Sequence, residues 1–150
     1  MYVKKARPLP IATQNLHLKT AFPKSKVTMN GKNRLVWTGQ LQPTLLSAVY
    51  TVQIIYKLDD TPEVRVLEPK LVARDGKRLP HVFTGNLLCL FRYKYGEWNS
   101  TMSLAATIAP WTSLWLSHYE VWLATGTWCG SKQEHPGENE QRERPTVAGS

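Results

Sequence analysis

A histidine, an asparagine and a cysteine lie within nine residues of one another near the middle of the chain: His81, Asn86 and Cys89. A cysteine thiolate can attack a carbonyl carbon and carry the acyl group as a thioester, and a nearby donor can stabilise the oxyanion that forms. His81 and Asn86 are the candidate donors. Cys89 lies between two leucines, however, so its neighbours also fit a small buried core residue.

The composition limits which other chemistry the chain can perform. Its 150 residues, 42% hydrophobic and 20% charged, suit one ordinary domain, and no run of eighteen apolar residues suggests a membrane span. The N-terminus shows no apolar signal segment, and two cysteines, Cys89 and Cys129, are too few for a disulfide framework or a zinc site. We therefore expect a reduced, cytoplasmic protein without a metal, in which Cys129 is incidental.

The net charge of +8 comes from 19 Lys and Arg against 11 Asp and Glu. The stretch from Lys4 to Arg34 holds eight basic residues and no acidic one, so the N-terminal fifth carries the imbalance. Such a surplus, together with six tryptophans, fits a basic nucleic-acid-binding module. The tryptophans fall at core-like helical positions and are not interleaved with Lys and Arg, which argues against nucleic acid as a partner.

The elements that must position His81 and Cys89 are a sheet before them and a helix after them. Residues 34–42, 49–57 and 63–67 are rich in β-branched and aromatic residues and are separated by turn signals, which predicts an antiparallel meander. Beyond Trp98 the apolar spacing becomes helical, and Pro110 suits the first turn of a helix over residues 111–125 that ends at Gly126. These elements predict an α+β domain.

Four aromatic residues of the second half share one face of the predicted helix. Spacings of 4, 4 and 3 residues separate Trp111, Trp115, Tyr119 and Trp122, and we expect this face to pack on the sheet. After Gly130 the chain is polar and holds a single large aliphatic residue, so we expect residues 131–150 to form a disordered tail. Residues 1–130 then form the domain.

The order of these features resembles the ubiquitin-conjugating-enzyme (UBC) fold family over about residues 8–130. In that family an N-terminal helical segment and a β-meander precede a His-Pro-Asn-type motif, a nucleophilic cysteine about eight residues on, and a Trp followed by C-terminal helices. The segments that match are Glu68-Pro69, Leu79-Pro80-His81, Leu88-Cys89-Leu90 and Glu97-Trp98. The resemblance implies a UBC-like fold with Cys89 as nucleophile.

His81 occupies the position at which eukaryotic members of the family have the asparagine of the His-Pro-Asn-type motif. His81 can stabilise the oxyanion as an N–H donor, act as acid or base, or only brace the loop, and Asn86 is a second candidate donor. The basic N-terminal segment is either a solvated face or, by the resemblance, a docking surface for an activating enzyme.

The amino-acid sequences of several further segments are similar to those of prokaryotic stand-alone members of this fold. These members are encoded in antiphage signalling operons (CBASS type II, short form). The segments are Pro80-His81-Val82-Phe83, Pro110-Trp111-Thr112, Trp115-Leu116 and Tyr119-Glu120. This resemblance implies that Cys89 carries the C-terminal carboxyl of a protein, the operon's cGAS/DncV-like nucleotidyltransferase, and passes it to an amine, which regulates cyclic-nucleotide signalling.

The transfer needs no cofactor, but the chain has no Gly-rich phosphate loop, so a separate activating enzyme must adenylate the carboxylate. The alternative function on the same fold is a non-catalytic binding scaffold, in which Cys89 is a packed core residue.

Overall fold

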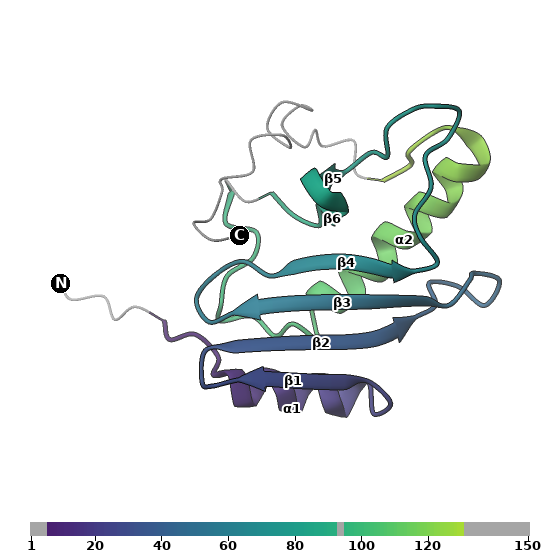
Figure 1. Ribbon diagram of the computed structural model, residues 1–150. Helices are drawn as coiled ribbons and strands as arrows, with labels where there is room; N and C mark the ends of the chain where they lie inside the picture. Colours follow the sequence, from purple (N-terminus) through teal and green to yellow (C-terminus); the bar gives the residue numbers. More distant parts are fainter. Residues whose placement is uncertain (1–5, 93–94, 131–150) are drawn as a thin grey trace.

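A computed structural model describes residues 6–92 and 95–130. The predicted disordered tail, residues 131–150, lies outside the described residues, as do Lys4 and Lys5 of the basic segment. The architecture is α+β, as predicted, with a helix before an antiparallel sheet and a second helix at the end (Figure 1). The elements are α1 (Ile11–Ala21), β1 (Lys26–Asn30), β2 (Arg34–Leu41), β3 (Tyr50–Lys57), β4 (Glu63–Glu68), β5 (Val82–Phe83), a 3-10 turn (Thr84–Asn86), β6 (Leu87–Leu88) and α2 (Ile108–Thr125).

The four-stranded sheet has the order β1-β2-β3-β4, with every neighbouring pair antiparallel. The predicted meander over residues 34–67 is confirmed, because β2, β3 and β4 begin and end within one residue of the predicted segments. β1 is an edge strand that the sequence analysis does not predict. Four of its five residues are exposed, so it lacks the alternation of apolar and polar residues that marks a half-buried strand.

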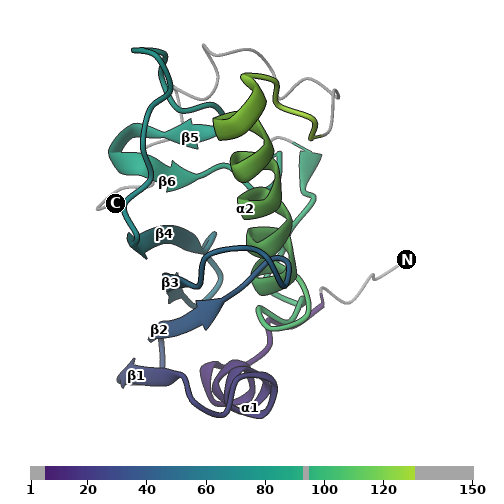
Figure 2. The ribbon, with the colours of Figure 1, turned by 90° about the vertical axis from the view of Figure 1, so that its right-hand side faces the viewer.

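Both helices cover the same face of the sheet (Figure 2). Alternate residues of β2 and β3 point into this face, which includes Trp37, Ile54 and Tyr56, each fully buried. Trp115, Tyr119 and Trp122 of α2 join the same core, as their spacing predicts, while Trp111 is partly buried against it. Altogether, four of the six tryptophans are buried, and these four cannot stack on the bases of a nucleic acid. No helix of the described residues is both long enough and apolar enough to span a membrane.

The helical pattern expected beyond Trp98 begins in the structure only at Ile108, because residues 101–107 form turns. α1 supplies the reason. The side-chain amide of the fully buried Gln14 donates to the carbonyl of Met102 (2.8 Å) and accepts from the N–H of Leu104 (2.9 Å), so these backbone groups are engaged outside any helix. The expectation of several C-terminal helices is therefore wrong for the described residues, in which α2 is the only helix beyond Trp98. Pro110 lies in the first turn of α2, as predicted.

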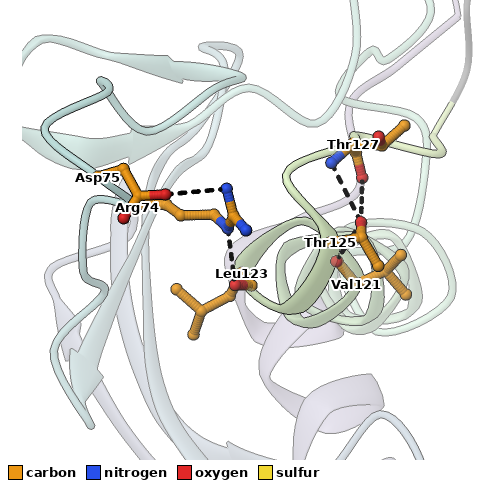
Figure 3. A network of polar contacts seen from close by, with 6 residues as sticks. All are labelled: Arg74, Asp75, Val121, Leu123, Thr125 and Thr127. Carbon is orange, nitrogen blue, oxygen red and sulfur yellow. Dashed lines mark hydrogen bonds and ion pairs between the residues drawn. The ribbon is translucent and has the colours of Figure 1, made fainter.

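The C-terminal end of α2 is tied to the long loop between β4 and β5 (Figure 3). Arg74 of this loop donates from Nε to the carbonyl of Leu123 (3.1 Å), where a positive charge also interacts favourably with the helix dipole. Gly126 ends the helix in the left-handed region (φ 81°), as predicted, and its N–H donates to the carbonyl of Trp122. Thr125 Oγ1 then accepts from the N–H of Thr127 (3.1 Å). These contacts define the path of the chain that leads to Trp128.

Candidate active site

A short hairpin places His81 opposite Cys89. Strands β5 and β6 pair Val82 with Leu88, and the next pair outward is His81 and Cys89. The N–H of Cys89 donates to the carbonyl of His81 (3.0 Å), so the ladder continues to this pair. The spacing of eight residues between the histidine and the cysteine is thus closed by a hairpin turn, which brings the two predicted site residues together.

The backbone of His81 is held from two sides. Its carbonyl also accepts a hydrogen bond from the indole Nε1 of Trp115 (3.0 Å), which joins the hairpin to α2. His81 has a φ of 54°, in the left-handed region that residues with a side chain seldom adopt. A strained backbone of this kind persists only where its surroundings over-determine it, and the two hydrogen bonds to one carbonyl do so here.

The ring of His81 packs against the chain that follows α2. Its centroid lies 4.7 Å from that of Trp128, with the two planes tilted by 34°. Trp128 in turn contacts the ring of Trp115 at 5.3 Å. The hairpin, α2 and the C-terminal segment therefore meet at one aromatic cluster beside Cys89.

Cys89 lines a pocket of about 480 Å³ between these elements, although the residue is only 5% exposed. On the protein side it packs with Phe83 and Leu87 of the hairpin, and its Sγ lies 3.9 Å from the carbonyl oxygen of Phe91. The thiol thus stands at the border between an apolar cluster and an open volume. The pocket is lined by His81, Cys89, Leu90, Phe91, Glu97, Trp111, Leu114, Trp115, His118 and Trp128.

Asn86, the second candidate donor, lies at the opposite end of the hairpin from Cys89. It is exposed at the tip of the turn, with a φ of 58°, directly after Gly85 at 77°. It does not line the pocket. Cys129 is exposed next to Trp128 and does not line the pocket either. The structure thus brings His81, but not Asn86, to the cysteine.

Glu97 borders the pocket and is engaged by Arg92. Its carboxylate accepts from the backbone N–H of Arg92, and Nε and Nη2 of the guanidinium each lie 3.3 Å from Glu97 Oε2. With two guanidinium nitrogens at one carboxylate oxygen and the backbone N–H at the other, these contacts hold together the two ends of the segment between Phe91 and Trp98. The guanidinium of Arg92 thereby partly neutralises the Glu97 carboxylate at the border of the pocket.

Several pocket residues are not predicted as site residues from the sequence, foremost His118 and Trp128. His118 lies three residues after Trp115 on α2, and a spacing of three places both on the same side of the helix. That spacing is the signal that could have identified His118. Trp128 gave no such signal, because only the turn after Gly126 brings it back to the hairpin.

This arrangement can perform nucleophilic acyl chemistry. It offers a thiol, an imidazole across a hairpin from it, and enough volume for a thioester and an incoming group, since ligand pockets usually measure roughly 300–1,000 Å³. Among the described residues, no three His, Cys, Asp or Glu side chains gather as a metal site would require.

A family model described as "Type II CBASS E2 protein" matches residues 14–136, which include the hairpin, α2 and every residue that lines the pocket. The basic residues Lys4, Lys5 and Arg7 lie before the matched range. No curated protein matches the chain at a significant level.

Proposed function

The chain belongs to the type II CBASS E2 family, and from this we propose that it is a UBC-fold transferase that carries an acyl group as a thioester on Cys89. The family gives the chain an E2-like role in CBASS antiphage signalling. The observation that supports the thioester is the position of Cys89, which lines a pocket beside His81 at the junction of the hairpin and α2.

In the proposed reaction, the Cys89 thiolate attacks the activated C-terminal carbonyl of a protein. A bond forms between Sγ and the carbonyl carbon, and the bond to the previous carrier breaks. An amine then attacks the same carbon, the C–S bond breaks, and an amide forms with release of the thiolate. A thioester suits this sequence because the thiolate is a good leaving group, so the protein itself needs no cofactor.

We assign His81 two tasks in this reaction. Its main chain braces the hairpin, which its hydrogen bonds with Cys89 and Trp115 support. Its ring supplies an N–H donor to the oxyanion of the tetrahedral intermediate, a role that positioned side-chain donors perform in acyl transfer.

The acyl donor we propose is a cGAS/DncV-like nucleotidyltransferase of the same operon, joined through its C-terminus. A separate activating enzyme must supply the carboxylate in activated form, because the sequence has no phosphate-binding loop. Conjugation of the nucleotidyltransferase to an amine would then regulate its production of a nucleotide messenger.

Co-expression of the chain with its genomic neighbours tests the proposal. The wild-type protein should migrate partly as an adduct on non-reducing gels, and a thiol reductant should remove this adduct. Cys89→Ser should give an adduct that resists the reductant, because an oxyester replaces the thioester, and Cys89→Ala should give none. The matched control, Cys129→Ala, should behave as the wild type, since Cys129 does not line the pocket.

The burial of Cys89 favours a second candidate function, a non-catalytic scaffold of the same fold. A cysteine that is 5% exposed and packed with Phe83 and Leu87 can be a core residue alone. The scaffold predicts that Cys89→Ala keeps partner binding and that native Cys89 does not react with iodoacetamide. The transferase predicts alkylation of Cys89 through the pocket at a rate above that of global unfolding.

A further inference from the structure

We infer that His118 is a second catalytic histidine of this site, whose imidazole accepts the proton that the attacking amine must lose. The inference rests on the proposed function, since it concerns the discharge of the Cys89 thioester.

The position of His118 supports this role. It lines the same pocket as Cys89, but from α2 and not from the hairpin. Its ring centroid lies 5.8 Å from that of Trp128, and the ring of His81 lies 4.7 Å from the same indole. Two imidazoles thus border one pocket with an indole in contact with both, and the open volume between these walls and Cys89 is where an incoming amine must lie.

The ring of His118 is available and yet restrained. It is half-buried, and in the described part of the chain it makes no hydrogen bond that would occupy its nitrogens. The interior of an 18-residue helix fixes its backbone, and Gly130 approaches it closely, because a Cβ there would lie 3.0 Å from His118 Cδ2. An imidazole with free nitrogens and a defined position is what general base catalysis requires.

The two histidines differ in their structural roles. The backbone of His81 orders the hairpin and adopts a strained φ, so its place is set by its link with Cys89. His118 has no such structural bond to the hairpin. The other titratable side chains that line the pocket are Cys89 itself and Glu97, whose carboxylate is engaged by Arg92. His118 is therefore the base within the pocket that can be replaced without a change to the hairpin that positions Cys89.

The proton balance of the step is as follows. His118 takes one proton from the ε-ammonium of the acceptor and becomes an imidazolium. The neutral amine nitrogen then forms a bond with the thioester carbon, and the adduct, positive on nitrogen and negative on oxygen, loses a second proton from nitrogen to water. The oxyanion collapses, the C–S bond breaks, and the thiolate of Cys89 leaves. The products are the amide, the thiolate and a protonated His118, which returns its proton to water.

Discharge of a chemically loaded thioester tests the inference. The probe is the 2-mercaptoethanesulfonate thioester of acetylglycine, which loads Cys89 by thiol exchange without an activating enzyme, in a Cys129→Ala background. The acceptors are the ε-amine of Nα-acetyl-lysine, which is protonated at neutral pH, and hydroxylamine, which is not. The variants are His118→Asn and the matched control His17→Asn, which alters a histidine of α1 that contacts Ser103 away from the pocket.

His118→Asn should load Cys89 to the wild-type extent and hydrolyse no faster. Its discharge to the ε-amine at pH 7 should fall by about 100-fold, within the range of general base catalysis, and the deficit should narrow as the pH rises and the amine loses its own proton. Discharge to hydroxylamine should change by less than about twofold, because that nucleophile needs no such base. His17→Asn should match the wild type throughout.

Two results would overturn the role of His118: discharge to the ε-amine at the wild-type rate, or an equal loss with both nucleophiles at every pH, which indicates a structural effect. Absence of any adduct on wild-type Cys89 with this probe would overturn the proposed function, and the role of His118 with it.

Discussion

The hydrogen bond from Trp115 to His81 should hold the hairpin of Cys89 in place, and Trp115→Phe removes it with little change in shape. The loss of one neutral N–H···O bond of 3.0 Å costs about 1 kcal/mol. The phenyl ring also leaves a volume of about 40 Å³ unfilled at a site that is 4% exposed, which adds about 1 kcal/mol. We expect a total decrease of about 2 kcal/mol in the free energy of unfolding.

The matched control is Trp122→Phe on the same helix. Trp122 is 5% exposed and its ring contacts Tyr119, but its indole nitrogen makes no hydrogen bond within the described residues. The control therefore removes the same volume without the hydrogen bond, and we expect a decrease of about 1 kcal/mol. Equilibrium unfolding in urea gives both values, and their difference isolates the bond to His81.

The reactivity of Cys89 provides a second readout for the same pair of variants. Once the hairpin is released from α2, iodoacetamide should alkylate Cys89 faster in Trp115→Phe than in the wild type, whereas Trp122→Phe should leave the rate unchanged. Cys129→Ala is the background for both, since Cys129 is exposed. Equal stability losses and equal alkylation rates in the two variants would refute the argument that this bond positions the site.

Three further predictions concern the site and the elements that support it. His81→Asn, which keeps an N–H donor, should retain more of the rate of thioester discharge than His81→Ala, and equal rates for these two variants would remove the ring from the mechanism. Asn86→Ala at the exposed hairpin tip should leave the rate within about twofold of the wild type. Gln14→Leu should lower the free energy of unfolding in urea by about 2–4 kcal/mol, because the N–H of Leu104 loses its partner in the core and the carbonyl of Met102 loses one; a change below about 1 kcal/mol would contradict this. The pKa of Tyr50 is raised by burial and by its hydrogen bond to Glu120, so this tyrosine ionises at lower pH in the unfolded chain than in the folded one. Its contribution to the free energy of unfolding should be fully present below about pH 10 and fall above it. Tyr50→Phe should flatten that fall in alkaline unfolding curves.

The meander and the final helix could be predicted because long, half-buried elements leave a periodic pattern. β2 and β3 alternate buried with less buried residues over eight positions each, and α2 repeats its aromatic residues every three or four. The short elements gave no such pattern. β1 is mostly exposed, and β5 and β6 have two residues each, too few for any period.

The segment before α2 was wrongly predicted as helical because buried residues of a turn can mimic helical spacing. Leu104 and Ile108 are both fully buried and four residues apart, but Gln14, about ninety residues away in the chain, engages the backbone between Met102 and Leu104. A partner so remote in sequence leaves no local trace. The same holds for Trp128, whose indole contacts the ring of His81 only in three dimensions.

The most direct test of the central claim is a mass measurement on Cys89 itself. The chain is isolated at acid pH from cells that express its genomic neighbours, digested without reductant, and the peptide that contains Cys89 is sequenced by tandem mass spectrometry. The proposed function predicts a C-terminal peptide of another protein joined to Cys89 and released by hydroxylamine, with unmodified Cys129. A Cys89 peptide that carries no acyl group while the operon is active would contradict it.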